Sequence, residues 1–215
     1  MFIGHYGVSF AIRARDKSIP LWVLFIAVQF LDVFWSIFVF SGIEKVRIVP
    51  GITATNPLDL YYMPYTHSLI GALCWSVVGL ATYKLGWRSN LAAALLVAAA
   101  VFSHWVLDLI VHRPDLALYD DTYKVGFGLW DYPVIAFALE IVLLFGGMFL
   151  YLRSTQANNA VGKFGMPALG LLLIAAQSIV FFGSPPTSGA ATTVTALVAY
   201  IVFAAAASWL ERQRG

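Results

Sequence analysis

One apolar stretch of the chain carries three side chains of the kinds that bind metal ions. His104, Asp108 and His112 follow one another at intervals of four residues. Four residues turn an α-helix by about 400°, so the three side chains form a nearly straight stripe on one helix face. Imidazole and carboxylate groups on neighbouring turns can reach one divalent ion. The spacing indicates either a metal site or a hydrogen-bonded polar pair that locks two helices together.

Further metal-binding residue types lie in other apolar segments. Asp32 lies within a long apolar stretch, His67 opens the next one, and His5 lies in a short apolar segment before both. An aspartate near the middle of a spanning helix costs about 2.5 to 3.5 kcal/mol on insertion scales. Asp32 and Asp108 therefore need a partner that offsets this cost, and a shared cation would be such a partner.

The elements that must position these residues are membrane-spanning helices. The chain is 60% apolar and 11% charged, against about 25% charged residues in typical soluble domains. A spanning helix needs about 20 mostly apolar residues. We therefore expect an all-α, polytopic transmembrane bundle in a single domain, residues 1–215. Its six predicted spans are Ile19–Ile43, Thr66–Leu85, Asn90–Val111, Tyr132–Leu152, Met166–Phe182 and Ala190–Leu210.

The segment before the first span is too short to cross a bilayer. Phe2–Ile12 fits as a half-helix that is buried against the bundle and ends at Arg13, because protein can then cover its backbone ends. At about 1.5 Å per residue, Asp32 lies roughly 16 Å and His104 roughly 21 Å from the cytoplasmic ends of their spans. This similar depth predicts that the two residues meet, so residues 1–140 would carry the metal site.

His5 and His67 each lie near the start of an apolar segment, and each reaches the site only if the chain around it is buried. His67 reaches it if the loop 56–65 dips inward, for which Pro57 and Pro64 offer breaks. His5 reaches it if the half-helix is buried, and its alternative place is the membrane interface. From these residues alone, His67 is a predicted ligand and the membrane interface is the favoured place for His5.

Lysine and arginine are distributed unevenly over the predicted loops. With the amino terminus inside, nine lie on the inner side and four lie in the outer loops 44–65 and 112–131. By the positive-inside rule, both termini then lie in the cytoplasm and the site lies in the outer half of the membrane. We expect a multi-pass protein of a bacterial cytoplasmic membrane. The inner residues are Arg13, Arg15, Lys17, Lys84, Arg88, Arg153, Lys163, Arg212 and Arg214, and the outer ones are Lys45, Arg47, Arg113 and Lys124.

Other features of the sequence narrow the function classes. The net charge of +2 is too small to indicate a nucleic-acid partner. The single cysteine, Cys74, excludes an intramolecular disulfide. Residues 164–210 contain no charged side chain, so we expect them to form two plain scaffold helices. The first long apolar run contains Asp32 and has no small-residue cleavage site, so we expect a spanning helix there rather than a signal peptide.

The order of these residues resembles the YdjM family of membrane-bound, metal-dependent hydrolases. The resemblance covers residues 1–133, and the family is itself distantly similar to the zinc-dependent phospholipase C and single-strand nuclease superfamily. The motifs that carry the resemblance are Gly4-His5, Leu31-Asp32, Tyr65-Thr66-His67-Ser68, Ser103-His104 with Asp108, and an apolar segment with proline at Leu129–Pro133.

The resemblance implies a site for divalent metal, with zinc as the expected ion. In the superfamily, a histidine near the amino terminus helps to bind a second metal that shares the last aspartate, which carries over onto His5 and Asp108. The chain lacks the second acid and the histidine that the family has after its first aspartate, so we expect one or two ions rather than three. The residues around the first metal carry over onto Asp32, His67, His104 and Asp108.

These residues predict a membrane-embedded hydrolase that acts on an ester or phosphoester of an amphiphilic, lipid-like substrate through metal-activated water. His112 could assist as an extra ligand or a proton carrier, although we expect a surface histidine at the helix end. Glu140 could accept a hydrogen bond from a ligating imidazole or could be a buried protonated acid that is hydrogen-bonded to a neighbouring helix. The alternatives are a carrier for metal ions or protons and a closed, purely structural metal site.

Overall fold

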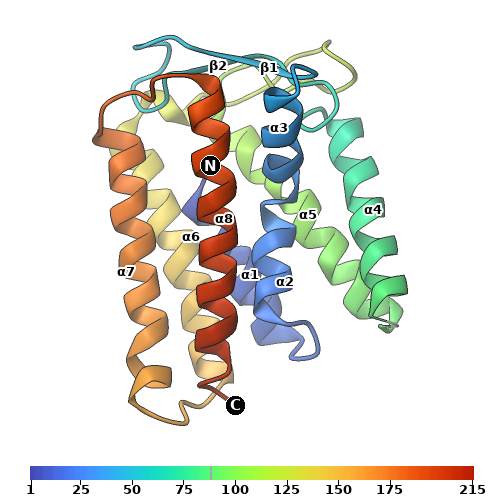
Figure 1. Cartoon of the computed structure of the whole chain (residues 1–215), viewed down its shortest axis with the longest axis vertical. Helices are drawn as coiled ribbons and strands as arrows, with labels where there is room; N and C mark the ends of the chain where they lie inside the picture. The colour runs from blue at the N-terminus through green and yellow to red at the C-terminus, as the bar shows by residue number, and fades with distance from the viewer. Residues whose placement is uncertain (88) are drawn as a thin grey trace.

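The computed structural model describes residues 1–87 and 89–215, so the predicted inner cation Arg88 lies outside the described residues. The described chain forms an all-α bundle with a small two-stranded sheet across one end (Figure 1). This confirms the predicted fold class. The helices are α1 (Ile3–Arg15), α2 (Leu21–Val28), α3 (Phe30–Phe40), α4 (Leu69–Gly86), α5 (Leu91–Val111), α6 (Pro133–Ser154), α7 (Ala160–Phe182) and α8 (Gly189–Glu211), and the strands are β1 (Lys45–Ile48) and β2 (Leu58–Tyr62).

The helices α4 to α8 are each long and apolar enough to cross a membrane. A sixth span is possible if α2 and α3 count as one, but the two helices meet at an angle of 52°. The predicted span Ile19–Ile43 is therefore broken at Gln29, which separates the two helices. Gln29 is buried and its side-chain amide donates to the Phe2 carbonyl oxygen (3.2 Å). This hydrogen bond connects the break between α2 and α3 to the residue that precedes α1.

The short helix α1 lies inside the bundle, as the half-helix prediction requires. It contacts α2, α5, α6 and α7, and Figure 1 shows the amino terminus in the upper half of the bundle with α1 below it. Two glycines allow the close approach of α1 to α6: a Cβ atom on Gly7 would overlap the backbone of Leu143, and one on Gly147 would overlap the backbone of Gly7. The packing therefore fixes the depth of α1 in the bundle.

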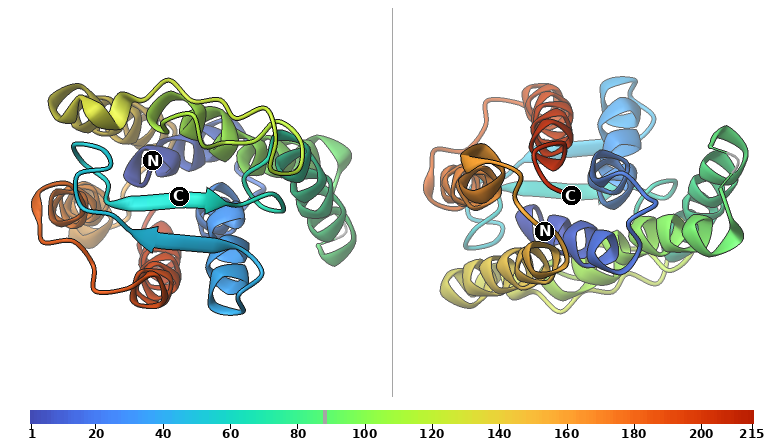
Figure 2. Two further views of the ribbon diagram at one scale, coloured as in Figure 1. Left: turned by 90° about the horizontal axis from the view of Figure 1, so that it is seen from above. Right: turned by 90° about the horizontal axis from the view of Figure 1, so that it is seen from below.

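The loop after α3 contains an antiparallel β-hairpin that the sequence analysis does not predict. Its strands pair Lys45 with Tyr62 and Arg47 with Asp59. Seen from above, the hairpin lies across the end of the bundle (Figure 2, left). A second apolar cluster beneath it includes Trp35, Leu60, Met63, Val111 and Trp130. The hairpin thus covers the end of the bundle that holds the histidines and aspartates of the predicted site.

Candidate metal centre

The predicted ligands come together from four separate segments of the bundle. Two groups of them have ligand atoms close enough to hold an ion: Asp32, His67 and His104 form one group, and His5, His104 and Asp108 form the other. Asp32 lies in the first turn of α3, directly after the break at Gln29. His67 lies next to Ser68, the N-cap of α4, so the loop before α4 does bring it inward.

The distances within the cluster match the spacing of ligands around a metal. Two ligand atoms on a tetrahedral zinc ion lie about 3.3 Å apart, because each bond to zinc is about 2.0 to 2.2 Å long. Asp108 Oδ2 lies 3.1 Å from His104 Nε2, and Asp32 Oδ1 lies 3.3 Å from His67 Nε2 and 3.6 Å from His104 Nε2. Most of these contacts are longer than the 2.7 to 3.2 Å expected of a hydrogen bond.

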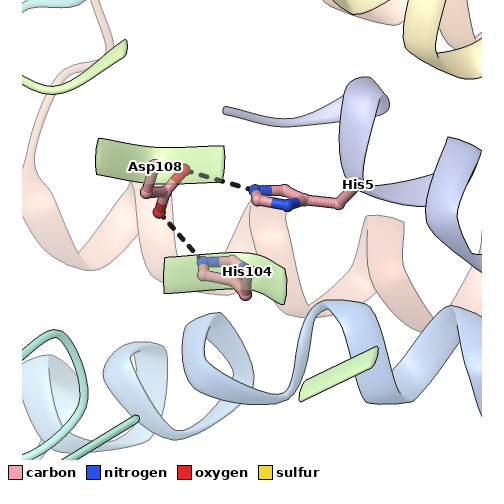
Figure 3. Close-up of side chains that lie close together, drawn as sticks. All are labelled: His5, His104 and Asp108. Carbon is pink, nitrogen blue, oxygen red and sulfur yellow. Dashed lines mark ion pairs between the residues drawn. The ribbon is translucent and has the colours of Figure 1, made fainter. Parts of the chain in front are cut away.

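The two carboxylate oxygens of Asp108 face different histidines. Oδ1 lies 3.3 Å from His5 Nε2, and Oδ2 lies 3.1 Å from His104 Nε2 (Figure 3). Oδ2 also lies 3.8 Å from His67 Nε2 and 3.5 Å from His112 Nε2. Asp108 is thus the one carboxylate in the described cluster that reaches both groups with separate oxygen atoms.

His104 is oriented by the end of α2. Its Nδ1 lies 2.6 Å from the carbonyl oxygen of Val28, and a carbonyl oxygen only accepts, so Nδ1 carries the proton. In its neutral form the ring would present the Nε2 lone pair to the carboxylates of Asp32 and Asp108, as a metal ligand must. Nε2 is buried and makes no hydrogen bond to a described residue. A cation between these groups would remove the repulsion between the lone pair and the two acids.

His67 is oriented by a chain of hydrogen bonds. The Thr66 hydroxyl donates its one proton to Glu44 Oε2 (2.6 Å), so its contact with His67 Nδ1 (2.8 Å) must use the proton of the imidazole. The Nε2 lone pair of His67 then faces Asp32. Burial raises the pKa of the Glu44 carboxyl above its ordinary value, against the opposing effects of His67 and the hydrogen bonds from Thr66.

His112 belongs to the cluster, and its predicted place on the surface is wrong. It is 2% exposed, and its Nδ1 lies 2.8 Å from Asp115 Oδ1. Asp115 also lies 3.3 Å from Arg113 Nε. The carboxylate fixes the proton on Nδ1, so Nε2 points its lone pair toward Asp108. The chain turns back directly after α5, and this turn buries His112 because Trp130 stacks near its ring at a centroid distance of 4.2 Å.

His5 lies inside the bundle rather than on its surface. It is fully buried, and neither ring nitrogen makes a hydrogen bond to a described residue. Its ring stacks on His104 with centroids 4.0 Å apart. The amino group of Met1 donates to the same Asp108 oxygen that His5 faces (2.5 Å). A buried imidazole with two unpartnered nitrogens costs free energy, and a bound ion would offset that cost.

Glu140 has a different role from the predicted imidazole acceptor. Its carboxylate accepts from the backbone N–H groups of Phe2 (3.0 Å) and Gly4 (3.1 Å) and from Gln177 Nε2 (2.7 Å). It therefore caps the start of α1, where a helix dipole favours negative charge. The alternative prediction, a buried acid bonded to a neighbouring helix, describes it better. Glu140 acts on the site through the position of α1 and His5.

Tyr200 is a site residue that the sequence analysis missed. Its hydroxyl donates to Asp32 Oδ2 (2.8 Å), which leaves Oδ1 to face the histidines. Tyr200 lies on α8, within the segment expected to be plain scaffold, and one tyrosine in an apolar helix carries no signal in its spacing. Only the packing of α8 against α3 brings it to Asp32.

The cluster lies at the edge of a cavity of about 720 Å³. Asp32, His67, Asp108 and His112 contribute to its lining, together with the loop after β1 and parts of α7 and α8. A molecule in this cavity would therefore touch the carboxylates and imidazoles directly. The cluster can therefore be reached from the cavity.

The comparisons with known proteins add no relative. No family model, curated protein or solved structure matches the chain. The site must therefore be judged from its own geometry.

The hydroxyl of Thr66 offers a direct test of the His67 chain. Thr66→Val removes the group that joins His67 to Glu44, and loss of such an outer partner typically weakens metal binding about 10- to 100-fold. Thr66→Ser keeps the hydroxyl and should bind zinc nearly as the unchanged protein does. Chelator competition measures both affinities. Equal affinity in the valine and serine variants would show that the hydrogen bond does not orient a ligand.

Proposed function

We propose that this multi-pass membrane protein is a metal-dependent hydrolase whose ion is held by Asp32, His67, His104 and Asp108. The observation that carries the proposal is the uniform orientation of three imidazoles. His67, His104 and His112 each bond through Nδ1 to an acceptor and turn Nε2 toward the two carboxylates. Metal-ligating histidines use their second nitrogen in this way. Membership of the YdjM family is part of the proposal.

Zinc is the ion that we propose, because imidazole and carboxylate ligands suit it and a bound zinc lowers the pKa of a coordinated water to about 7. The side chains divide the remaining tasks. Asp108 joins the first group to His5, where a second ion could bind. His112 lines the cavity and can take or return a proton at Nε2, since Asp115 holds its Nδ1 proton.

Two observations favour a hydrolase over the alternatives. A closed structural site does not need access, whereas four residues of this cluster line a large cavity. An ion carrier needs a polar path away from the site, but the interior along α1 beyond His5 is filled by packed aromatic rings. Tyr6 stacks on Phe25 at 4.4 Å between centroids, and Phe10 packs edge-on against the same ring.

The function is tested on purified, full-length protein in detergent. We expect elemental analysis to find zinc in a fixed ratio to protein, and we expect the loaded protein to hydrolyse a lipid ester or phosphoester. Removal of zinc by a chelator should abolish hydrolysis, and zinc should restore it. Absence of stoichiometric metal after attempted loading would refute the proposal. Zinc flux through protein-containing vesicles without hydrolysis would favour a carrier instead.

We also propose that both termini face the cytoplasm and that the site lies in the outer half of a bacterial cytoplasmic membrane. The distribution of lysine and arginine supports this orientation. In a Cys74→Ser background, an impermeant maleimide added to intact cells should label Tyr119→Cys and spare Asn158→Cys. The opposite labelling pattern would invert the orientation.

A further inference from the structure

The walls of the site cavity differ in chemistry from the metal cluster at its edge. Ala176, Ile179 and Val180 line it from α7, and Ala196 and Phe203 line it from α8. These are apolar side chains, so the space between the two helices suits a hydrocarbon chain. Ile179 and Val180 are 72% and 53% exposed, so the cavity is open at the wall that α7 forms.

No lysine or arginine is present among the described residues that line the cavity. The cations nearest to the hairpin end already have acidic partners: Arg47 lies 2.6 Å from Asp59, and Arg113 bonds to both Asp59 and Asp115. Sites that recognise phosphate usually present arginine, lysine or a helix N-terminus. The Met1 amino group also lines the cavity, but it is already paired with Asp108 Oδ1 (2.5 Å). The described lining therefore offers a phosphate no unpaired cationic side chain.

The acidic residues in the cavity lining are Asp32 and Asp108, and Asp108 is paired with the Met1 amino group (2.5 Å). A phosphate brought into this apolar cavity would lose its hydration. An uncharged substrate avoids that cost.

The polar side chains of the cavity rim are neutral. They include Asn56, Ser184, Thr187 and Thr195, which offer hydroxyl and amide groups. Such groups can bind an uncharged head group that carries hydroxyls. The lining as a whole thus matches a molecule with an apolar chain, a neutral polar head and a reactive bond between them.

We propose that the substrate is an uncharged long-chain carboxylic ester with a hydroxyl-bearing head group, whose chain lies between α7 and α8. This inference rests on the proposed hydrolase function and narrows its substrate. In the reaction, the oxygen of water forms a bond to the carbonyl carbon and the carbon–oxygen bond to the alcohol breaks. One proton of the water goes to the leaving alcohol and the other leaves from the carboxylic acid. No oxidant or further reactant is needed.

The test compares two lipids that differ by one phosphate. Zinc-loaded, full-length protein is given 1-oleoylglycerol or 1-oleoylglycerol 3-phosphate in mixed micelles, and oleate and inorganic phosphate are both measured. We expect oleate release from 1-oleoylglycerol to be at least tenfold faster than release of either product from the phosphorylated lipid. Binding gives a readout independent of turnover: the uncleavable 1-O-hexadecylglycerol should raise the Tm of the protein more than its 3-phosphate does.

A pair of variants on α8 tests the place of the chain. Ala196 lines the cavity, whereas Val198 is 56% exposed and does not line it. Ala196→Trp should reduce oleate release by at least tenfold while zinc content stays unchanged. Val198→Trp should leave both measurements unchanged. Equal oleate release in both variants would overturn the placement of the chain.

The possible outcomes distinguish a wrong substrate from a wrong function. Faster release of phosphate than of oleate would overturn this inference and leave a metal-dependent hydrolase in place. Release of neither product by zinc-loaded protein, with no change in Tm, would overturn the inference and the proposed function together.

Discussion

Asp108→Asn should empty the site of metal more completely than any other single change in the cluster. The variant keeps the shape of the side chain but removes the negative charge that faces His5 through Oδ1 and His104 through Oδ2. Loss of an outer hydrogen-bond partner typically costs about 10- to 100-fold in metal affinity, and loss of this shared ligand should cost more than about 100-fold. Elemental analysis of metal per protein, after purification in a fixed zinc concentration, measures the effect.

The other ligands should show a graded pattern in the same measurement. Asp32→Asn and His104→Ala should release the first ion as Asp108→Asn does, because each removes one of its ligands. His5→Ala should release only a second ion. His112→Ala should retain more metal than Asp108→Asn, since His112 Nε2 lies 3.5 Å from Asp108 and belongs to neither ligand group.

One result would reverse the assignment. If His112→Ala emptied the site while Asp108→Asn kept its full metal content, His104 and Asp108 would be a polar pair that joins helices. Both variants should be checked for a folded helical bundle by circular dichroism, so that loss of metal is not confused with loss of fold.

Periodic features of the sequence predicted most of the fold. Composition and the length of the apolar runs placed α4, α5, α6 and α8 within about three residues of their ends, because any spanning helix must satisfy the same length and polarity constraints. The observed α7 begins at Ala160, before the predicted start at Met166. The spacing of four between His104 and Asp108 likewise placed both on one face of α5. These features depend on local geometry, which the chain order contains directly.

Features that depend on contacts between distant segments could not be predicted in the same way. At the break, Gln29 bonds to the backbone of Phe2 just before α1, and His112 is buried by the turn after α5 and by Trp130. Tyr200 reaches Asp32 across 168 positions of the chain. Each depends on which helices pack together, and no periodic pattern in the sequence records that choice.

Glu140 shows how a correct residue can be given the wrong partner. Its position in an apolar helix indicated that it bonds to something buried, but the sequence offered no means to distinguish an imidazole from a helix N-terminus. The structure shows the carboxylate at the backbone N–H groups of Phe2 and Gly4. Its effect on the site therefore passes through α1, as does that of the glycines that pack α1 against α6.

Gly147→Ala should displace α1 and remove His5 from the cluster. A Cβ atom at Gly147 would overlap the carbonyl group of Gly7, and a backbone group cannot rotate away as a flexible side chain can. Such overpacking typically costs about 1 to 3 kcal/mol. The neighbouring Gly146 provides a matched control, because a Cβ atom there would meet nothing within 4 Å. Gly146→Ala should be neutral or stabilising by up to about 1 kcal/mol, since alanine favours the helix more than glycine does.

Thermal unfolding in detergent and metal content together decide this prediction. We expect Gly147→Ala to lower the Tm and to lose the ion bound through His5 while retaining the ion bound through Asp32 and His67. Gly146→Ala should retain the metal content of the unchanged protein. If both alanine variants unfolded at the same temperature and kept the same metal content, the close contact between α1 and α6 would not be what holds His5 against Asp108.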